Sequence, residues 1–238
     1  MHLSQPLKLH FVALIAASLL FMADHALAAT AMITNMNGTV SVHKSDGSLK
    51  VLSQKSEVDT GDVIATEKNS YARLKFTDGG EITIRPESVL TIDAYTFEEN
   101  KPQQDSFILG LIKGGFRTIT GLIGKRGNRD AYRANAVTAT IGIRGTDYGS
   151  LLCNKNCGSL PDGQYVDVKN GKINISNKAG ELDVNAGEYA YVKDADTAPV
   201  LLPGNPGLPE FKEEDTVAGG LGTFLAGVIP EGAGCFIQ

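Results

Sequence analysis

The sequence predicts an all-β protein, an antiparallel β-sandwich or irregular β-roll built from hairpins, with little helix. Three observations support this fold class. Short runs in which apolar and polar residues alternate recur from about Gly38 onward. Dipeptides of Asn or Asp followed by Gly separate several of these runs. No segment shows a sustained apolar period of 3.6 residues with capping residues, as an amphipathic helix would.

Three of these dipeptides predict β-hairpins. Asp46-Gly47 separates TVSVHK from SLKVL, Asp78-Gly79 separates YARLKF from EITIR, and Asn170-Gly171 separates YVDV from KINIS. Both central positions of such a turn need the left-handed backbone region, which Asn, Asp and Gly reach at low cost. Further strands are predicted at residues 63–66, 89–92, 107–112, 116–120, 137–143, 182–184 and 189–192.

The second hairpin also predicts which side chains form the core. Successive side chains of a strand point to opposite faces, and its apolar residues occupy alternate positions. Buried side chains are therefore expected at Ala72, Leu74, Phe76, Ile82 and Ile84, and outward-facing ones at Arg73, Lys75, Thr83 and Arg85.

Both ends of the chain differ from this β region in composition. Residues 1–28 combine Lys8, an apolar stretch over 11–23 and an A-x-A pattern at 26–28, which predicts a secretory signal peptide cleaved after Ala28. No cysteine follows that site, so we expect soluble export to the periplasm or medium, with no membrane span after cleavage. Residues 29–194 form the predicted β domain, and 195–238 a Pro- and Gly-rich C-terminal tail, flexible and outside the core.

Composition argues against several functions. A net charge of −5 and the absence of an aromatic-rich basic motif do not suit a nucleic-acid partner. Signal cleavage would leave His43 as the only histidine, on a strand with no nucleophile fixed near it. We therefore expect no enzyme and no cofactor.

Cys153 and Cys157 lie in the polar stretch LLCNKNCGSLPDG, whereas Cys235 lies in the tail. In an oxidising compartment the close pair predicts a small disulfide, with the pairing of Cys235 left open. The alternative is a zinc site built from these three thiolates and His43, although export disfavours it, and no metal site is expected.

The stretch TATIGIRGTDYG at 138–149 is the least generic part of the chain. Together with GTVSV, LIKGGFRTITGLIGK and VKNGKINIS, in that order, it resembles the FecR-domain family over most of residues 38–192. One departure is AVT at 136–138, where the family commonly has Thr-Pro. The resemblance implies a periplasmic or surface β module that contacts another protein without catalysis.

The best-known members of that family are transmembrane regulators that control a sigma factor through a cytoplasmic domain. The predicted cleavable leader instead makes this chain similar to a stand-alone, exported form, so the sigma-factor role is not carried over.

The stretch Arg144, Gly145, Thr146 and Asp147 is the signature turn of this resemblance. Gly142 and Gly145 permit a bend that ends strand pairing and directs Arg144 away from the strand. A bidentate pair between Arg144 and Asp147, or a nearby carboxylate, would then lock the turn, and this structural role is preferred over ligand binding.

Basic residues gather between positions 113 and 144, where Asp130 is the only acidic residue. They suggest a face for an anionic partner, such as an acidic protein surface, lipopolysaccharide phosphates or a wall polymer. Pairing with carboxylates elsewhere in the chain explains them equally well. The residues of this predicted face are Lys113, Arg117, Lys125, Arg126, Arg129 and Arg133.

These observations predict an exported, non-catalytic FecR-type β module that binds an envelope protein or transmits a signal in the bacterial envelope. The alternative is binding or hydrolysis of wall or surface polysaccharide through a carboxylate-lined groove.

Overall fold

The computed structural model describes residues 29–128 and 130–209; the predicted signal peptide and residues 210–238 of the predicted tail lie outside them. The described residues form 17 strands. Their only helical element is a 3-10 turn, Pro102–Gln104, and none of their helices is long and apolar enough to cross a membrane. The predicted all-β fold with little helix is confirmed. In chain order the strands are β1 (Ala31–Asn37), β2 (Val40–His43), β3 (Leu49–Val51), β4 (Glu57–Val58), β5 (Val63–Thr66), β6 (Tyr71–Phe76), β7 (Glu81–Ile84), β8 (Val89–Thr96), β9 (Ser106–Ile119), β10 (Tyr132–Ala136), β11 (Thr140–Ile143), β12 (Asp147–Cys153), β13 (Gly163–Asn170), β14 (Lys172–Asn177), β15 (Gly180–Asn185), β16 (Tyr189–Val192) and β17 (Val200–Leu202).

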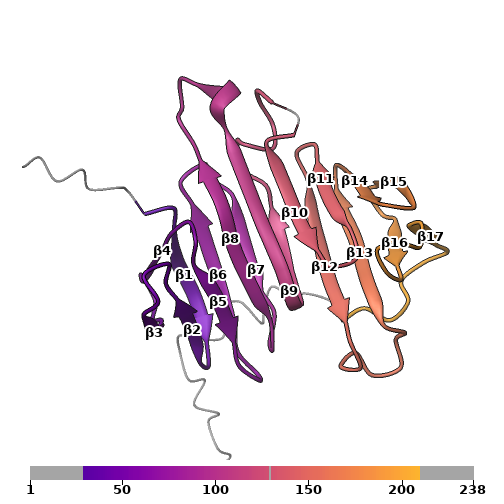
Figure 1. Cartoon of the computed structure of the whole chain (residues 1–238), viewed down its shortest axis with the longest axis horizontal. Coiled ribbons are helices and arrows are strands. Elements are labelled where there is room, and N and C mark those ends of the chain that lie inside the picture. The colour runs from indigo at the N-terminus through magenta and orange to yellow at the C-terminus, as the bar shows by residue number, and fades with distance from the viewer. Residues whose placement is uncertain (1–28, 129, 210–238) are drawn as a thin grey trace, which may run out of the picture.

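The strands form two layers that share β9 (Figure 1). Sheet A has the order β4-β1-β6-β7-β9-β12-β13-β16-β17. Sheet B has the order β3-β2-β5-β8-β9-β10-β11-β14-β15. All of these pairs are antiparallel except β9 with β10, which run parallel. In both sheets the strands that precede β9 in the chain lie on one side of it, and those that follow lie on the other.

The long strand β9 belongs to both layers because it bends at Gly114 and Gly115. Its first part pairs with β8 and β10 in sheet B, and its last part pairs with β7 and β12 in sheet A. Gly114 has a φ of +72°, and a Cβ there would lie 2.2 Å from Ser88 Oγ. The prediction of two separate strands, at 107–112 and at 116–120, was therefore wrong. These residues belong to one continuous strand that bends at Gly114 and Gly115.

Among the other places where the chain crosses between the sheets, two corners involve the motifs singled out in the sequence. β11 in sheet B continues through residues 144–146 into β12 in sheet A, and β13 in sheet A continues through Gly171 into β14 in sheet B. The predicted hairpin at Asn170-Gly171 was therefore wrong, because the strands on its two sides pair in different sheets. The predicted strand at 137–143 is shorter, since residues 137–139 form the turn between β10 and β11.

The core lies between the two layers and follows the predicted alternation. Ala72, Leu74, Phe76, Ile82 and Ile84 are all buried, as expected from their positions in the second hairpin. Aromatic rings fill the space near β9, where Phe107 packs edge-to-face on Tyr132, and Phe116 on Tyr148. The hydroxyl groups of Tyr132 and Tyr148 are 3.2 Å apart, so this buried pair shares a hydrogen bond.

Part of the predicted tail lies on the domain. β17 pairs with β16 at the edge of sheet A, and Leu208 is only 8% exposed. Leu208 packs in a second, smaller apolar cluster with Cys153 and Tyr165, on the outer face of sheet A.

Candidate functional site

The signature turn forms the corner at which β11 passes into β12. The Gly145 N–H donates to Gly124 O at 2.9 Å, and the Thr146 N–H donates to Thr120 Oγ1 at 2.8 Å. Thr146 Oγ1 donates to Lys172 O at 2.9 Å. The corner is therefore held by two segments, the one that follows β9 and the first residue of β14.

The predicted pair between Arg144 and Asp147 is not among the contacts of the described residues. Arg144 is exposed at the corner. Asp147 instead forms an ion pair with Arg117, whose Nη2 lies 2.7 Å from Asp147 Oδ1. The sequence could not indicate this partner, because Arg117 reaches Asp147 through the pairing of β9 with β12.

Arg117 also reaches Asp167 across the intervening strand β12. Its Nη1 lies 3.4 Å from Asp167 Oδ2. Gly149 lies between the two residues in the cross-strand row, and a Cβ at Gly149 would come within 2.3 Å of Asp167 Oδ1. The last glycine of TATIGIRGTDYG therefore provides the space in which Arg117 and Asp167 meet.

The predicted basic face is not one surface. Lys113 and Arg133 are exposed on strands of sheet B, whereas Arg117 lies on the outer face of sheet A. Lys125 and Arg126 lie in the connection between β9 and β10, and Arg129 lies outside the described residues. The sequence places these residues close together along the chain, but the bend of β9 separates them in space.

Arg126 has a structural environment. Its Nη1 donates to Glu99 O at 2.6 Å and its Nη2 donates to Glu98 O at 3.0 Å. Its Nε donates to the buried carboxylate of Asp105 at 3.2 Å, and its guanidinium lies 4.8 Å from the ring centroid of Phe97. Arg126 thus joins the connection after β9 to the one before it, in line with the alternative that these cations pair with carboxylates.

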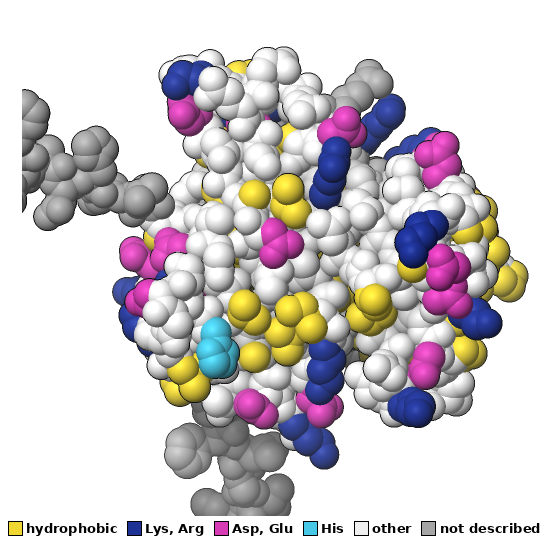
Figure 2. Space-filling view, viewed as in Figure 1, with side chains coloured by type: hydrophobic (Ala, Val, Ile, Leu, Met, Phe, Trp, Pro, Cys, Tyr) yellow, Lys and Arg dark blue, Asp and Glu magenta, His cyan; other side chains and the backbone are white. Residues whose placement is uncertain are grey.

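The outer face of sheet B carries a band of apolar side chains that sequence reasoning missed. Val51, Ala65 and Val89 share a cross-strand row through Ser41 on β2. On β9, Val89 pairs with Lys113 at a register shift, and the exposed Ile112 comes just before Lys113. The exposed Val137 follows Ala136, the last residue of β10, which pairs with Leu111 beside Ile112. Figure 2 shows hydrophobic side chains in the lower half of the face that displays this sheet. We call the band formed by Val51, Ala65, Val89, Ile112 and Val137 the apolar band.

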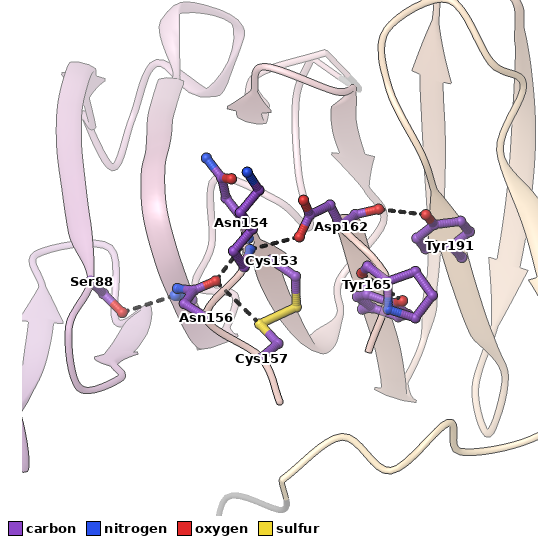
Figure 3. The surroundings of a disulfide bond; sticks show 11 residues. Ser88, Cys153, Asn154, Asn156, Cys157, Asp162, Tyr165 and Tyr191 are labelled. Carbon is purple, nitrogen blue, oxygen red and sulfur yellow. Dashed lines mark hydrogen bonds between the residues drawn. A yellow bond between two sulfur atoms is a disulfide. The ribbon is translucent and has the colours of Figure 1, made fainter. Parts of the chain in front are cut away.

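The predicted disulfide between Cys153 and Cys157 is present (Figure 3). It closes the loop that links β12 to β13, in which the Lys155 N–H donates to Asp162 Oδ1 at 2.6 Å. Tyr191 Oη donates to the backbone oxygen of Asp162, which ties this loop to β16. Oxidation of both sulfurs removes two of the thiolates that the alternative zinc site requires.

The remaining predicted ligands do not converge in the described part of the chain. His43 is exposed on β2, and Cys235 lies outside the described residues. Within residues 29–128 and 130–209, no group of three or more His, Cys, Asp or Glu side chains is placed to hold a metal ion.

A groove of about 460 Å³ beside β14 and β15 is lined in part by Asp130, Glu181 and Asp183, and it is relevant to the polysaccharide alternative. The hydrogen bond from Lys172 holds the pKa of Asp183 below its usual value. A glycosidase needs one carboxylic acid whose pKa is raised, so that it is protonated when it meets the substrate. The environment of Asp183 lowers the pKa of its carboxyl group, so Asp183 does not have the raised pKa that this role requires.

Comparison with known proteins identifies the family. Residues 62–174 match the model of a family described as FecR protein, and this segment of the chain belongs to that family. The matched segment begins just before β5 and ends within β14, so it includes the bend of β9, the corner at 144–146 and the corner at Gly171. The sequence resemblance is therefore confirmed. None of the curated proteins matches the sequence.

Solved structures show only a weak likeness. Two crystal structures of a candidate anti-sigma factor from Parabacteroides distasonis are 12% and 11% identical, with TM-scores of 0.44 and 0.45. Each comparison covers 59% of this chain and 58% of that one, so this chain spans little more than half of their length. A structure described as a cell surface anchoring domain is 26% identical over 26% of this chain and 80% of that one, with a TM-score of 0.25. The assignment to the FecR family therefore rests on the match over residues 62–174 and not on the solved structures.

Proposed function

We propose that this chain is an exported, non-catalytic FecR-type module that transmits a signal in the bacterial envelope by binding a partner protein. The family match over residues 62–174 supports a signalling role. The apolar band is the observation that supports binding through the outer face of sheet B.

The band has the character of a protein-contact surface. Val51, Ile112 and Val137 are 74%, 58% and 78% exposed, although each is a large apolar residue. Single exposed apolar residues are common, but a group of them on neighbouring strands of one face marks an interaction surface. Burying the apolar band against a partner would remove apolar area from water.

The charges beside the band indicate the kind of partner. Lys113 follows Ile112 on β9, and Arg133 lies on the same face of β10. Both side chains are exposed, and neither has an ion pair among the described residues. A partner with an apolar centre and an acidic rim would complement this surface, because rim charges favour encounter and register.

A variant pair tests this surface directly. The double variant Ile112→Glu with Val137→Glu should reduce recovery of the envelope partner at least about tenfold, because the two carboxylates would be buried against it. The matched control is Ile119→Glu, since Ile119 is 52% exposed at the other end of the same strand but on sheet A. Partner recovery is measured by photo-crosslinking in cells and quantitative mass spectrometry, with unfolding curves to check that the variants fold. Equal recovery for the double variant and the control would remove the proposal.

A further inference from the structure

The described chain ends on the outer face of sheet A, at the end of a segment that crosses this face. Residues 203–209 leave β17 at the edge of the sheet and reach Arg85, just after β7, where Arg85 Nη2 donates to Pro209 O at 2.7 Å. Asn205 Oδ1 accepts the N–H groups of Gly207 and Leu208, at 2.9 and 2.8 Å. These two bonds form a turn within the segment, and Leu208 and Pro209 hold the segment to sheet A through the apolar cluster with Tyr165 and the bond to Arg85. β6 is the next strand in the direction that the segment runs.

The surface around Pro209 is rich in arginine. Arg73 on β6 and Arg117 on β9 lie in one cross-strand row through Thr83, and Arg85 lies two residues beyond Thr83 on the same face. We call Arg73, Arg85 and Arg117 the arginine face. Sequence reasoning missed it because its members come from strands that pair through register, with no motif linking them.

The electrostatics of the arginine face favour an acidic occupant. Burial lowers the pKa of Arg85 to about 10, and the nearby charge of Arg117 acts in the same direction, whereas Asp167 opposes it. Arg117 is already paired with Asp147 and Asp167, so Arg73 and Arg85 are the members that an acidic occupant would meet. Arg73 Nε is buried with no hydrogen-bond partner among the described residues.

We propose that the arginine face binds the acidic segment at residues 210–215 of the same chain. This segment reads EFKEED, with four carboxylates and one lysine, and it follows Pro209 directly. Consecutive Cα atoms are about 3.8 Å apart, so a glutamate directly after Pro209 needs no long connection to reach Arg85.

Chain length also permits the rest of the segment to pass over β6. Six extended residues span about 20 Å, whereas neighbouring strands are about 4.8 Å apart. The carboxylates of Glu213, Glu214 and Asp215 can therefore meet Arg73 as well as Arg85. The acidic segment would cover sheet A in this way and leave the apolar band on sheet B available, so this inference does not depend on the proposed function.

The segment contains its own reporter, because Lys212 is a cleavage site for endoproteinase Lys-C. Docking should protect Lys212, since a protease requires an extended and accessible substrate. The experiment uses the full-length chain and follows release of the fragment that starts at Glu213 by mass spectrometry. Each rate is divided by the rate for a synthetic peptide of residues 207–220 with the same sequence, which corrects for protease preference.

The double variant Arg73→Gln with Arg85→Gln should be cleaved about tenfold faster than the parent chain. The control Arg133→Gln removes a cation from sheet B and should leave the rate unchanged. A second variant, Glu213→Gln with Glu214→Gln and Asp215→Asn, leaves both sheets intact and should also be cleaved faster, as should the parent at high salt, where ion pairs are screened.

A parent chain cleaved as fast as the free peptide would overturn the proposal and leave an acidic partner protein as the alternative occupant. An equal change in the Arg133→Gln control would overturn it too, because the effect would then not belong to the arginine face.

Discussion

At the scale of single residues, Gly149 decides whether Arg117 and Asp167 can meet. The two side chains lie on either side of β12, and the missing side chain at Gly149 leaves the space for their contact. Any Cβ there would collide with the Asp167 carboxylate at 2.3 Å. Since Arg117 also pairs with Asp147, a disturbance at Gly149 affects the ion pairs on both sides of this arginine.

The substitution Gly149→Ala is therefore expected to lower the free energy of unfolding by about 1–3 kcal/mol, as overpacking of a filled site does. The control is Gly142→Ala in β11, where a Cβ would meet nothing within 4 Å. There the change should be near zero or slightly stabilising, because alanine loses less backbone entropy than glycine on folding. Urea unfolding of both variants provides the comparison, and equal stability of the two would contradict the steric explanation.

At the scale of elements, the corners between the sheets are the feature that distinguishes this fold. The corner at 144–146 and the corner at Gly171 are in contact, because a Cβ at Gly171 would lie 2.5 Å from Gly145 O. The Arg144 N–H donates to Lys172 O at 3.2 Å, which joins the same two corners. The signature turn and the Asn170-Gly171 dipeptide therefore form one unit that passes two neighbouring strands between the layers.

The effect of this contact on stability can be measured separately from the effect of backbone strain at a positive φ. Gly171 and Gly47 both have positive φ, +79° and +84°, so alanine at either position should cost about 1–2 kcal/mol of backbone strain. Only Gly171→Ala also meets a backbone oxygen, whereas a Cβ at Gly47 meets nothing within 4 Å. Gly171→Ala should thus lower the free energy of unfolding by at least about 1 kcal/mol more than Gly47→Ala. Chemical denaturation of the two variants measures this difference, and equal losses would show that the corners are not tightly packed.

At the scale of the whole molecule, two tyrosines buried between the sheets make stability depend on pH in the alkaline range. Burial raises the pKa of Tyr132 to about 12, and it raises the pKa of Tyr148 well above its ordinary value. An unfolded tyrosine ionises near pH 10, so above that pH the unfolded chain loses protons that the folded chain keeps.

Stability should therefore be unaffected by these two groups below about pH 9 and fall above about pH 10, by up to about 1.4 kcal/mol per pH unit for each group. The double variant Tyr132→Phe with Tyr148→Phe should lose less stability than the parent chain between pH 9 and pH 11.5. Urea unfolding across this range measures the loss. A parallel decline in both proteins would show that other groups control the alkaline limit.

The sequence by itself determined the features that depend on neighbouring residues in the chain. Alternation in YARLKF and EITIR identified the buried face of β6 and β7, because side chains of a strand alternate whatever the strand pairs with. The short separation of Cys153 and Cys157 indicated the disulfide. The ordered motifs between residues 38 and 192 indicated the FecR family, whose model matches residues 62–174.

Only the tertiary structure decided which distant residues meet. Asn170-Gly171 has the composition of a hairpin turn, but the strands around it find their partners in different sheets. Arg117 pairs with Asp147 and Asp167 because the last part of β9 lies beside β12 in sheet A. The residues of the predicted basic face lie apart from one another because β9 bends from one sheet into the other. The apolar band and the arginine face likewise depend on the register between strands far apart in the sequence. Local periodicity reveals which face of a strand is buried, whereas register depends on how all the strands pack together.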